Sequence, residues 1–304
     1  MRSLLVPLVA ACAFAWGVAL AVGAVAGTSR APLRGRLAVA ATTTQVADMV
    51  RQVAGDRAQV AGLLAPNVDP HEHEVRPGDV DAVAAARVVF RSGGDVDAWM
   101  GDVERATGAE DRTVDLIAAV RAEGDDPHWW QDPRNGILAV AAIRRALTRA
   151  DPAGAAVYAR NAAAYTARLR AADRAIAACW AAVPAAQRQV VTTHDAYGYY
   201  ARRYGLTLAG SVLGSLSSRA QPSARTLARL VERLRADDIH AIFPERALNP
   251  AVEQAVADEA GVAVGTPLQG DALARGQSYL EALAHDTRAL VSGLTGRSCE
   301  VPVG

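Results

Sequence analysis

The feature that most constrains the fold is a stretch near the middle of the chain, residues 153–183, that carries no strand signal. It contains no proline and one glycine, Gly154, and it is rich in Ala, Arg and Leu, which are strong helix formers. The pattern predicts one helix of about 28 residues, or about 42 Å at 1.5 Å per residue. The helix should end at Pro184, and a helix of this length can span two domains.

On both sides of this stretch, short apolar runs alternate with helical patterns, which is typical of parallel sheets flanked by helices. Strands are expected at 37–41, 59–64, 87–90, 113–117, 189–193, 206–212, 239–243 and 262–267. Helices are expected at 45–53, 80–86, 96–107, 135–150, 197–204, 223–236, 250–260 and 277–294. We therefore expect an α/β fold with two lobes, each a mostly parallel sheet flanked by helices, bridged by one long rigid α-helix. The corresponding domains are 27–152, a connecting helix at 153–184, and 185–304.

The N-terminus predicts export from the cell. Arg2 precedes an almost unbroken apolar run from Leu4 to Ala26, which ends in small residues suited to cleavage. We interpret residues 1–26 as a signal peptide. An uncleaved anchor is one alternative, because about 23 apolar residues can span a bilayer. A lipoprotein is another, because residues 9–12 match a lipobox ending at Cys12. Each alternative places the mature chain in the periplasm or on the outer face of the cell membrane.

Two cysteines, Cys179 and Cys299, remain after the N-terminal segment. Export permits a disulfide between them, which would tie the end of the chain to its middle. Two free buried thiols are the alternative, and the sequence is compatible with both.

Three of the six histidines occur in similar settings, beside aspartate and just beyond an extended or loop segment. His71 and His128 each end an Asp-Pro-His triplet, and His194 directly follows the strand expected at 189–193. In each triplet, the aspartate can turn the local backbone or accept the second imidazole N–H, which fixes the tautomer of a ligating histidine. Ligands of open α/β folds collect beyond the C-terminal ends of strands. We therefore expect the three histidines to share a site between the lobes.

Four segments, in order, resemble the metal-binding receptors of ABC-type importers that serve zinc and manganese (cluster A-I). The resemblance covers nearly the whole mature chain and implies two α/β lobes bridged by one long helix. It also implies the metal ligands His71, His128, His194 and Asp271. The implied partners are the metal ion and the cognate permease and ATPase in the membrane, and they could include a metallochaperone; the receptor itself is expected to be a monomer. The segments are Asp69-Pro70-His71-Glu72, Asp126-Pro127-His128-Trp129-Trp130, Thr193-His194-Asp195-Ala196-Tyr197 and Gly270-Asp271-Ala272-Leu273.

The implied ligand set favours Zn²⁺ as the transported ion. Three imidazoles and one carboxylate suit Zn²⁺ in a closed tetrahedral site, whereas Mn²⁺ prefers more oxygen ligands. The third ligand of this family is His or Glu, and here it is His194. A manganese receptor of the same family is the alternative, because the chain lacks the long His-rich loop that many zinc-specific members carry between the first two ligands.

Other residues near these segments receive less specific interpretations. His73 is interpreted as a solvated or packing residue, with an auxiliary metal ligand as the alternative. Glu245 could hold a ligand histidine or balance charge in the site. His240 lies in an apolar strand pattern and is expected in the core, while Trp129 and Trp130 are expected to support the second histidine segment by packing.

Functions of other classes fit the sequence less well. A zinc hydrolase would need an open coordination position for water and a general base, and the chain has neither a His-Glu-x-x-His nor a Gly-x-Ser-x-Gly motif. We therefore expect a receptor and not an enzyme, with a surface adhesin on the same fold as a further alternative. No nucleic-acid partner is expected, because 32 basic and 32 acidic residues cancel and no long basic stretch occurs.

Overall fold

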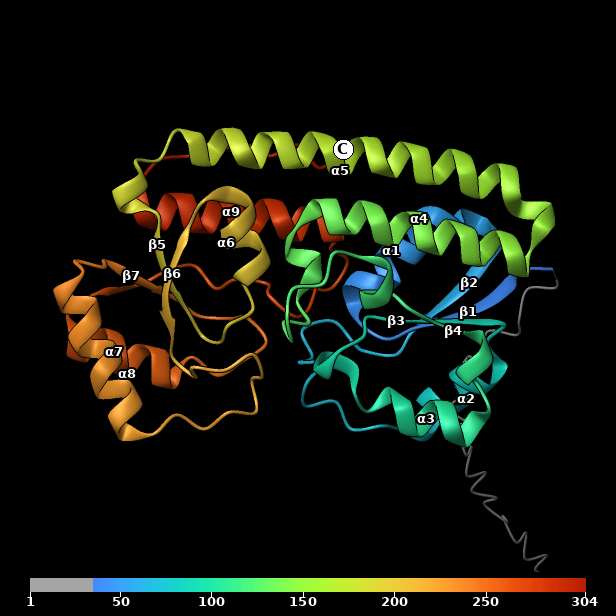
Figure 1. Ribbon diagram of the computed structural model, residues 1–304, viewed down its shortest axis with the longest axis horizontal. Coiled ribbons are helices and arrows are strands. Elements are labelled where there is room, and N and C mark those ends of the chain that lie inside the picture. Colours follow the sequence, from blue (N-terminus) through green and yellow to red (C-terminus); the bar gives the residue numbers. More distant parts are fainter. Residues whose placement is uncertain (1–34) are drawn as a thin grey trace, which may run out of the picture. The chain divides into compact units, whose positions relative to one another are not determined.

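The computed structural model describes residues 35–304, and its strands form two parallel four-stranded sheets (Figure 1). The orders are β2-β1-β3-β4 and β6-β5-β7-β8, so the first strand of each sheet lies in the interior and the α/β fold class is confirmed. The predicted signal peptide, anchor and lipobox in residues 1–26 lie outside the described residues. The strands are β1 (Leu37–Ala41), β2 (Ala58–Gly62), β3 (Val88–Arg91), β4 (Thr113–Asp115), β5 (Gln189–Thr192), β6 (Thr207–Ser211), β7 (Ala241–Phe243) and β8 (Ala263–Val264).

Nine α-helices connect these strands in the described part of the chain. Four of them begin at a Thr, Asp or Ser whose side chain accepts a hydrogen bond from the first helical turn, which is the usual N-cap. The helices are α1 (Thr44–Ala54), α2 (Pro77–Ala85), α3 (Met100–Thr107), α4 (Pro133–Ala150), α5 (Ala155–Ala181), α6 (Gly198–Tyr204), α7 (Ala224–Ala236), α8 (Ala251–Ala260) and α9 (Tyr279–Thr295). Within residues 35–304, none of the helices combines the length and the apolar character needed to cross a membrane.

Helix α5 is the long helix that the central stretch predicts. It is continuous over 27 residues, and it packs against α1 and α4 of the first lobe and α6 and α9 of the second. Figure 1 shows α5 running along one side of both sheets. Its buried positions recur with a helical period and include Tyr158, Tyr165, Leu169, Ile176 and Trp180. We use first lobe for β1–β4 with α1–α4, and second lobe for β5–β8 with α6–α9.

Helix α9 also reaches from one lobe to the other, which the sequence did not indicate. It packs against α5 and β7, while the backbone N–H of its first residue, Tyr279, donates to Asp48 on α1 at 3.0 Å. The Tyr279 hydroxyl donates to the carbonyl of Trp130 in the first lobe. The two lobes are therefore joined by two helices and not by α5 alone.

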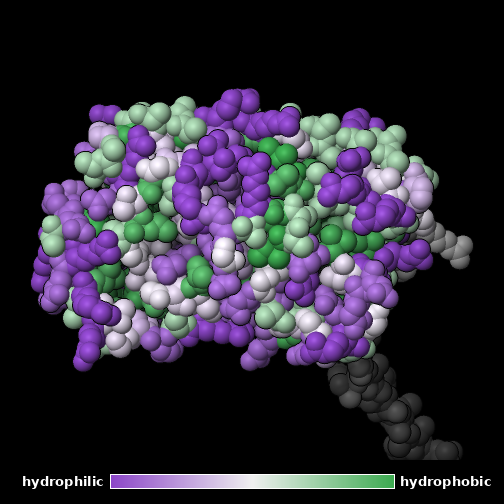
Figure 2. All heavy atoms as spheres, viewed as in Figure 1, coloured by the Kyte–Doolittle hydropathy of each residue, from purple (hydrophilic) through white to green (hydrophobic). Residues whose placement is uncertain are grey.

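One apolar core cluster runs through both lobes. It includes Val39 and Phe90 of the first sheet, Tyr200 and Phe243 of the second lobe, and Trp180 of α5, each at most 2% exposed. The division into domains at 27–152, 153–184 and 185–304 stays a prediction. Hydrophilic residues are spread over the face shown in Figure 2, and within residues 35–304 the exposed large hydrophobic side chains are Val75 and Val252.

Cys179, near the end of α5, and Cys299, in the C-terminal segment, form a disulfide with Cα atoms 5.8 Å apart. Of the two states that the sequence allowed for these cysteines, the structure shows the disulfide and not two free thiols. It ties the last residues of the chain to the long helix.

Two predictions about local structure were wrong. His240 is not in the core: its side chain is 71% exposed, because side chains alternate along an extended segment and its neighbours Ile239 and Ala241 point inward. The helix predicted over 96–107 is interrupted before α3 by a short 3₁₀ turn, Asp95–Asp97. There the Asp97 carboxylate accepts hydrogen bonds from Thr42 Oγ1 at 2.6 Å and from the Ser92 N–H at 2.7 Å, which fixes the turn to the ends of β1 and β3.

Candidate metal centre

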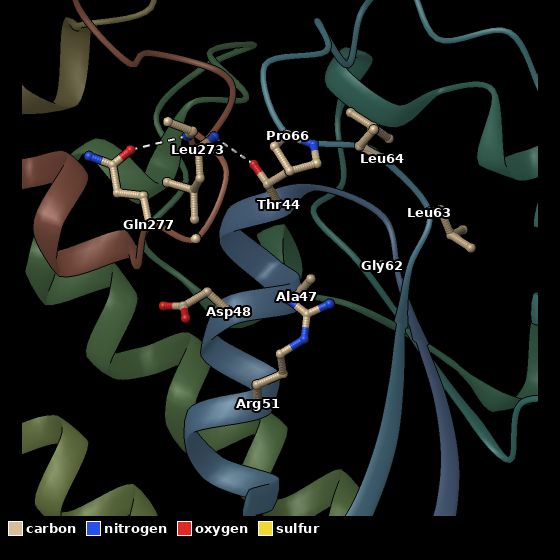
Figure 3. A pocket seen from close by; sticks show the side chains of 13 residues that line it. Thr44, Ala47, Asp48, Arg51, Gly62, Leu63, Leu64, Pro66, Leu273 and Gln277 are labelled. Carbon is tan, nitrogen blue, oxygen red and sulfur yellow. Dashed lines mark hydrogen bonds between the residues drawn. The ribbon is translucent and has the colours of Figure 1, made fainter. Parts of the chain in front are cut away.

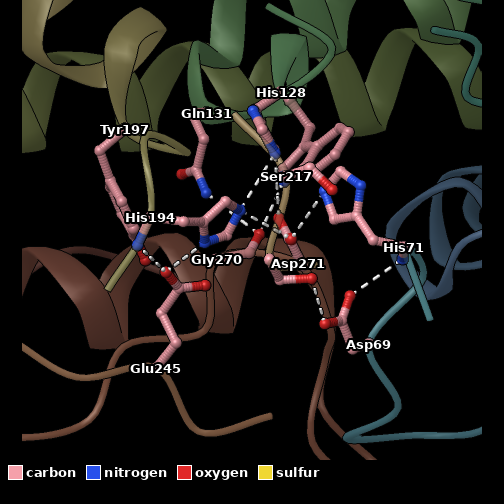
Figure 4. Close-up of polar contacts among 12 residues, drawn as sticks. Asp69, His71, His128, Gln131, His194, Tyr197, Ser217, Glu245, Gly270 and Asp271 are labelled. Atoms are coloured by element: carbon pink, nitrogen blue, oxygen red, sulfur yellow. Dashed lines mark hydrogen bonds and ion pairs between the residues drawn. The ribbon is translucent and has the colours of Figure 1, made fainter. Parts of the chain in front are cut away.

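The side chains of His71, His128, His194 and Asp271 meet between the two lobes (Figure 4). Each offers one ligand atom, and these four atoms all lie within 4.8 Å of one another. All four residues are at most 3% exposed. This is the one group of this kind in residues 35–304, and it is the group that the sequence predicted to converge.

The carboxylate of Asp271 lies among the Nε2 atoms of the three imidazoles. Its Oδ2 is 3.1 Å from His194 Nε2 and 3.4 Å from His71 Nε2, and its Oδ1 is 3.6 Å from His128 Nε2. The Nε2 atoms of His194 and His128 are 3.3 Å apart. The four side chains thus surround a small volume with one carboxylate and three ring nitrogens.

His194 is positioned by the central strand of the second sheet. It follows the end of β5 by two residues, and Glu245 follows the end of the neighbouring strand β7 by two residues. Glu245 Oε1 lies 2.6 Å from His194 Nδ1 and accepts the His194 backbone N–H at 3.3 Å. An imidazole that donates its Nδ1–H to Glu245 can present the lone pair of Nε2 to a metal ion, and Nε2 faces the other three side chains. Of the two roles considered for Glu245, the structure shows that it holds the histidine.

The aspartates of the two Asp-Pro-His triplets turn the backbone at their histidines. Asp69 Oδ1 accepts the His71 N–H at 2.9 Å, and Asp126 Oδ1 accepts the His128 N–H at 3.0 Å. Asp126 Oδ1 also lies 2.8 Å from His128 Nδ1, so this carboxylate orients the imidazole as well. The two triplets therefore share the backbone turn, while only the second one fixes its imidazole through the same aspartate.

Asp271 lies between β8 and α9, and its segment is held by both lobes. Leu268 pairs with Glu245 in the second lobe, while the residues on either side of Asp271 bond to the first lobe. The carbonyl of Gly270 accepts hydrogen bonds from Trp130 Nε1 at 2.8 Å, Gln131 Nε2 at 3.1 Å and Gln45 Nε2 at 3.3 Å. On the other side of Asp271, the Leu273 N–H donates to Thr44 Oγ1 at 2.8 Å, beside a cavity next to α1 (Figure 3). Sequence reasoning missed both glutamines and gave Trp130 only a packing role, although Trp130 and Gln131 directly follow the second triplet.

His73 does not join the four side chains. Its Nε2 lies 3.0 Å from Asp79 Oδ2, and its ring centroid is 4.6 Å from the ring of Trp99. It is 5% exposed, so of the interpretations considered the packing one fits.

Burial and charge act against each other in this group. Burial disfavours the charged form of His194, but the carboxylates of Glu245 and Asp271 outweigh it and raise the pKa of His194 well above its usual value. Burial likewise disfavours ionised Asp271, but His194 and His128 outweigh it and hold the pKa of Asp271 well below its usual value. Without a cation, positive charge on an imidazole compensates the carboxylate. A metal ion that binds here must therefore displace a proton.

A further buried carboxylate near the four side chains, Asp286, should make the stability of the fold depend on pH. Asp286 accepts hydrogen bonds from the Tyr197 hydroxyl at 2.8 Å and the Gln269 N–H at 2.9 Å, and burial raises the pKa of Asp286 to about 7 from 3.8. Its raised pKa means that the folded state binds the proton more tightly. The resulting stabilisation is fully present below about pH 4 and is lost as the pH rises through about 7.

We therefore expect Asp286→Asn, which cannot ionise, to gain stability relative to the wild type by about 2–3 kcal/mol between pH 5 and pH 8. Urea unfolding of both proteins at the two pH values measures this difference. A difference in unfolding free energy that is the same at pH 5 and pH 8 would contradict the assignment.

The chain is similar to a known protein family and to several characterised relatives. Residues 39–293 match the family model described as zinc-uptake complex component A, periplasmic (ZnuA). The chain is 31% identical over 252 residues to the manganese-binding lipoprotein MntA of Bacillus subtilis, covering 78% of this chain and 82% of the relative. It is 26% identical over 299 residues to the manganese ABC transporter substrate-binding lipoprotein PsaA of Streptococcus pneumoniae, covering 91% and 96%. Among solved structures, the periplasmic zinc-binding protein TroA of Treponema pallidum superposes with a TM-score of 0.81 at 26% identity, covering 86% of this chain and 99% of that one.

Proposed function

This chain belongs to the family of the periplasmic zinc-uptake complex component A, the substrate-binding receptors of ABC-type metal importers, and we propose that Zn²⁺ is its cargo. Members of the family are receptors and not enzymes, and this one is exported, to the periplasm or to the outer face of the cell membrane. Its partners are the metal ion and the permease and ATPase of the importer. In this proposal His71, His128, His194 and Asp271 are the ligands of the ion.

The observation that carries the proposal is a set of buried polar atoms that lack partners. Within the described residues, both ring nitrogens of His71 and both carboxylate oxygens of Asp271 are buried without a hydrogen bond of good geometry, although imidazole nitrogens lie 3.1–3.6 Å from the carboxylate. Nearly all buried polar atoms in proteins are satisfied, and exceptions call for an explanation. A cation among these four side chains would bond to Asp271 and to one nitrogen of each imidazole, and it would compensate the carboxylate charge.

The spacing of the ligand atoms supports Zn²⁺. A tetrahedral ion with Zn–N bonds of about 2.0–2.1 Å has ligand atoms about 3.3 Å apart. Four of the six separations among these side chains run from 3.1 to 3.6 Å, with either oxygen of Asp271 counted, and all four ligand atoms lie within 4.8 Å of one another. Zn²⁺ also stands above Mn²⁺ in the order of divalent affinities for nitrogen and oxygen ligands.

Mn²⁺ is the second candidate, and the relatives favour it. MntA and PsaA are both named for manganese, whereas TroA is named for zinc. A receptor can take a weaker-binding ion if that ion is the one available to it. Family membership thus supports a divalent metal as cargo, and the choice between the two ions depends on the site itself.

Competition at equal free metal concentrations tests the proposal. The purified chain, stripped of metal, is dialysed against buffered Zn²⁺ and Mn²⁺ together, and the bound metal is measured by elemental analysis. We expect Zn²⁺ to be retained, with a dissociation constant at least about tenfold lower than that of Mn²⁺, or about 1.4 kcal/mol. Retention of Mn²⁺ would make manganese the cargo, and binding of neither ion would refute the four-ligand site.

A further inference from the structure

In both Asp-Pro-His triplets, the two carboxylate oxygens of the aspartate contact residues of different lobes. Asp69 Oδ1 accepts the His71 N–H, whereas its Oδ2 accepts the hydroxyl of Ser218 at 2.5 Å. Asp126 Oδ1 faces His128, whereas its Oδ2 lies 3.6 Å from Arg202 Nη2. In each triplet, one oxygen accepts the backbone N–H of a site histidine and the other faces the opposite lobe.

The partners of the second oxygens come from two separate elements of the second lobe. Ser218 lies in the loop between β6 and α7, and Arg202 lies on α6. Both aspartates are at most 8% exposed and Ser218 is buried with Asp69, whereas the Arg202 side chain is half-exposed, so the second contact lies at the edge of the interface between the lobes. The same interlobe arrangement thus occurs twice, once for each histidine of the first lobe.

The contact at Asp126 belongs to a larger set of interlobe bonds. The Tyr199 hydroxyl accepts the Glu123 N–H at 2.8 Å and donates to the Asp126 carbonyl at 3.2 Å. Arg202 also pairs with the Glu123 carboxylate, and its guanidinium carbon lies 5.0 Å from the centre of the Tyr199 ring. The segment that leads to His128 is therefore held to α6 by its backbone as well as by its side chains.

The start of α6 has the residue that this close approach needs. A Cβ atom at Gly198 would lie 2.5 Å from Asp126 Oδ2, which is closer than real Cβ contacts come. Any larger residue would displace either α6 or the Asp126 carboxylate, and both changes disturb the contact. Glycine at this position therefore allows the guanidinium of Arg202 to reach Asp126.

We propose that the pairs Asp69–Ser218 and Asp126–Arg202 form an interlobe latch. It couples the closed arrangement of the lobes to the backbone position of His71 and to the position and ring orientation of His128. While the lobes are together, each aspartate is fixed at both oxygens and holds its histidine in place. When the lobes separate, each aspartate loses its partner in the second lobe and can rotate away from its histidine. Opening then disorders two ligands of the first lobe at the same time as it removes His194. The inference rests on the proposed function, and it assigns positioning roles to Ser218 and Arg202, which do not touch the ion.

The latch predicts a faster release of Zn²⁺ when its second-lobe side is removed. We expect the double variant Ser218→Ala/Arg202→Ala to release Zn²⁺ to an excess of a chromophoric chelator up to about 10-fold faster than the wild type. This lies at the low end of the effect of losing a direct partner of a metal ligand, because both residues act through the aspartates. The conservative variant Ser218→Thr/Arg202→Lys keeps a hydroxyl and a positive charge, and it should restore much of the slow release. Arg233→Ala is the matched control, because Arg233 is a half-exposed arginine of the second lobe that pairs with Asp237 on its own helix end.

Two further measurements separate the latch from a general loss of structure and from the proposed function. The thermal unfolding midpoint of the metal-free double variant should match that of the Arg233→Ala control. If the wild type binds Zn²⁺ and the double variant releases it at the same rate as the wild type, the latch is wrong but the proposed function stands. A wild type that binds neither Zn²⁺ nor Mn²⁺ would overturn the proposed function and the latch with it.

Discussion

Replacing His194 with alanine is expected to weaken Zn²⁺ binding about a thousandfold, or about 4 kcal/mol. His194 is the one member of the four-residue group that the second sheet positions, and its Nε2 is within 3.3 Å of both Asp271 and His128. Its loss removes a ligand outright, so the effect should exceed the 10–100-fold typical of losing a partner of a ligand. Titration of the metal-free protein with Zn²⁺, against a chelator of known affinity, measures the change.

His240→Ala is the matched control for this variant. His240 is a histidine of the same lobe that is exposed and lies outside the group, so its removal should leave the dissociation constant unchanged. If His194→Ala also binds Zn²⁺ with wild-type affinity, His194 is not a ligand and the four-ligand site is wrong.

Removal of the disulfide is expected to have the largest effect on stability. Cys179 and Cys299 are 120 residues apart, and closing a loop of this size restricts the unfolded chain considerably. We expect Cys179→Ser to lower the free energy of unfolding by about 2–5 kcal/mol. Urea unfolding under oxidising conditions measures the loss.

A reducing buffer provides the control for the disulfide. With the bridge reduced, the wild type should lose about as much stability as Cys179→Ser has lost, and the two proteins should then unfold at similar urea concentrations. Equal stability of the two proteins in oxidising buffer would show that the bridge contributes nothing to the folded state.

The sequence predicted the parts of the fold that depend on local patterns. The continuous helix over 153–183 could be predicted because helix formers run without a break up to Pro184, and α5 occupies nearly that whole stretch. His240 was misplaced because an apolar run does not tell which side chains face outward, whereas the sheet decides this through the inward positions of Ile239 and Ala241.

The convergence of the four side chains was predictable only in part. The two Asp-Pro-His triplets and the strand before His194 point to ligand positions, but Asp271 came from the family resemblance alone. Nothing local in the sequence shows that Gln45, Trp130 and Gln131 meet at the carbonyl of Gly270. Contacts over 139 residues or more depend on tertiary packing, which local patterns do not encode.

The anchoring of Gly270 has a consequence for the way in which the cargo would leave. Trp130, Gln131 and Gln45 tie the carbonyl of Gly270 to the first lobe. On the other side, Leu268 pairs with Glu245 and the Gln269 N–H donates to Asp286, so the Asp271 segment is bonded to both lobes. Separation of the lobes would therefore have to break the bonds on one side of Asp271. A withdrawal of β5 would strip at least one imidazole from the ion and leave an incompletely coordinated half-site with one face open to the permease.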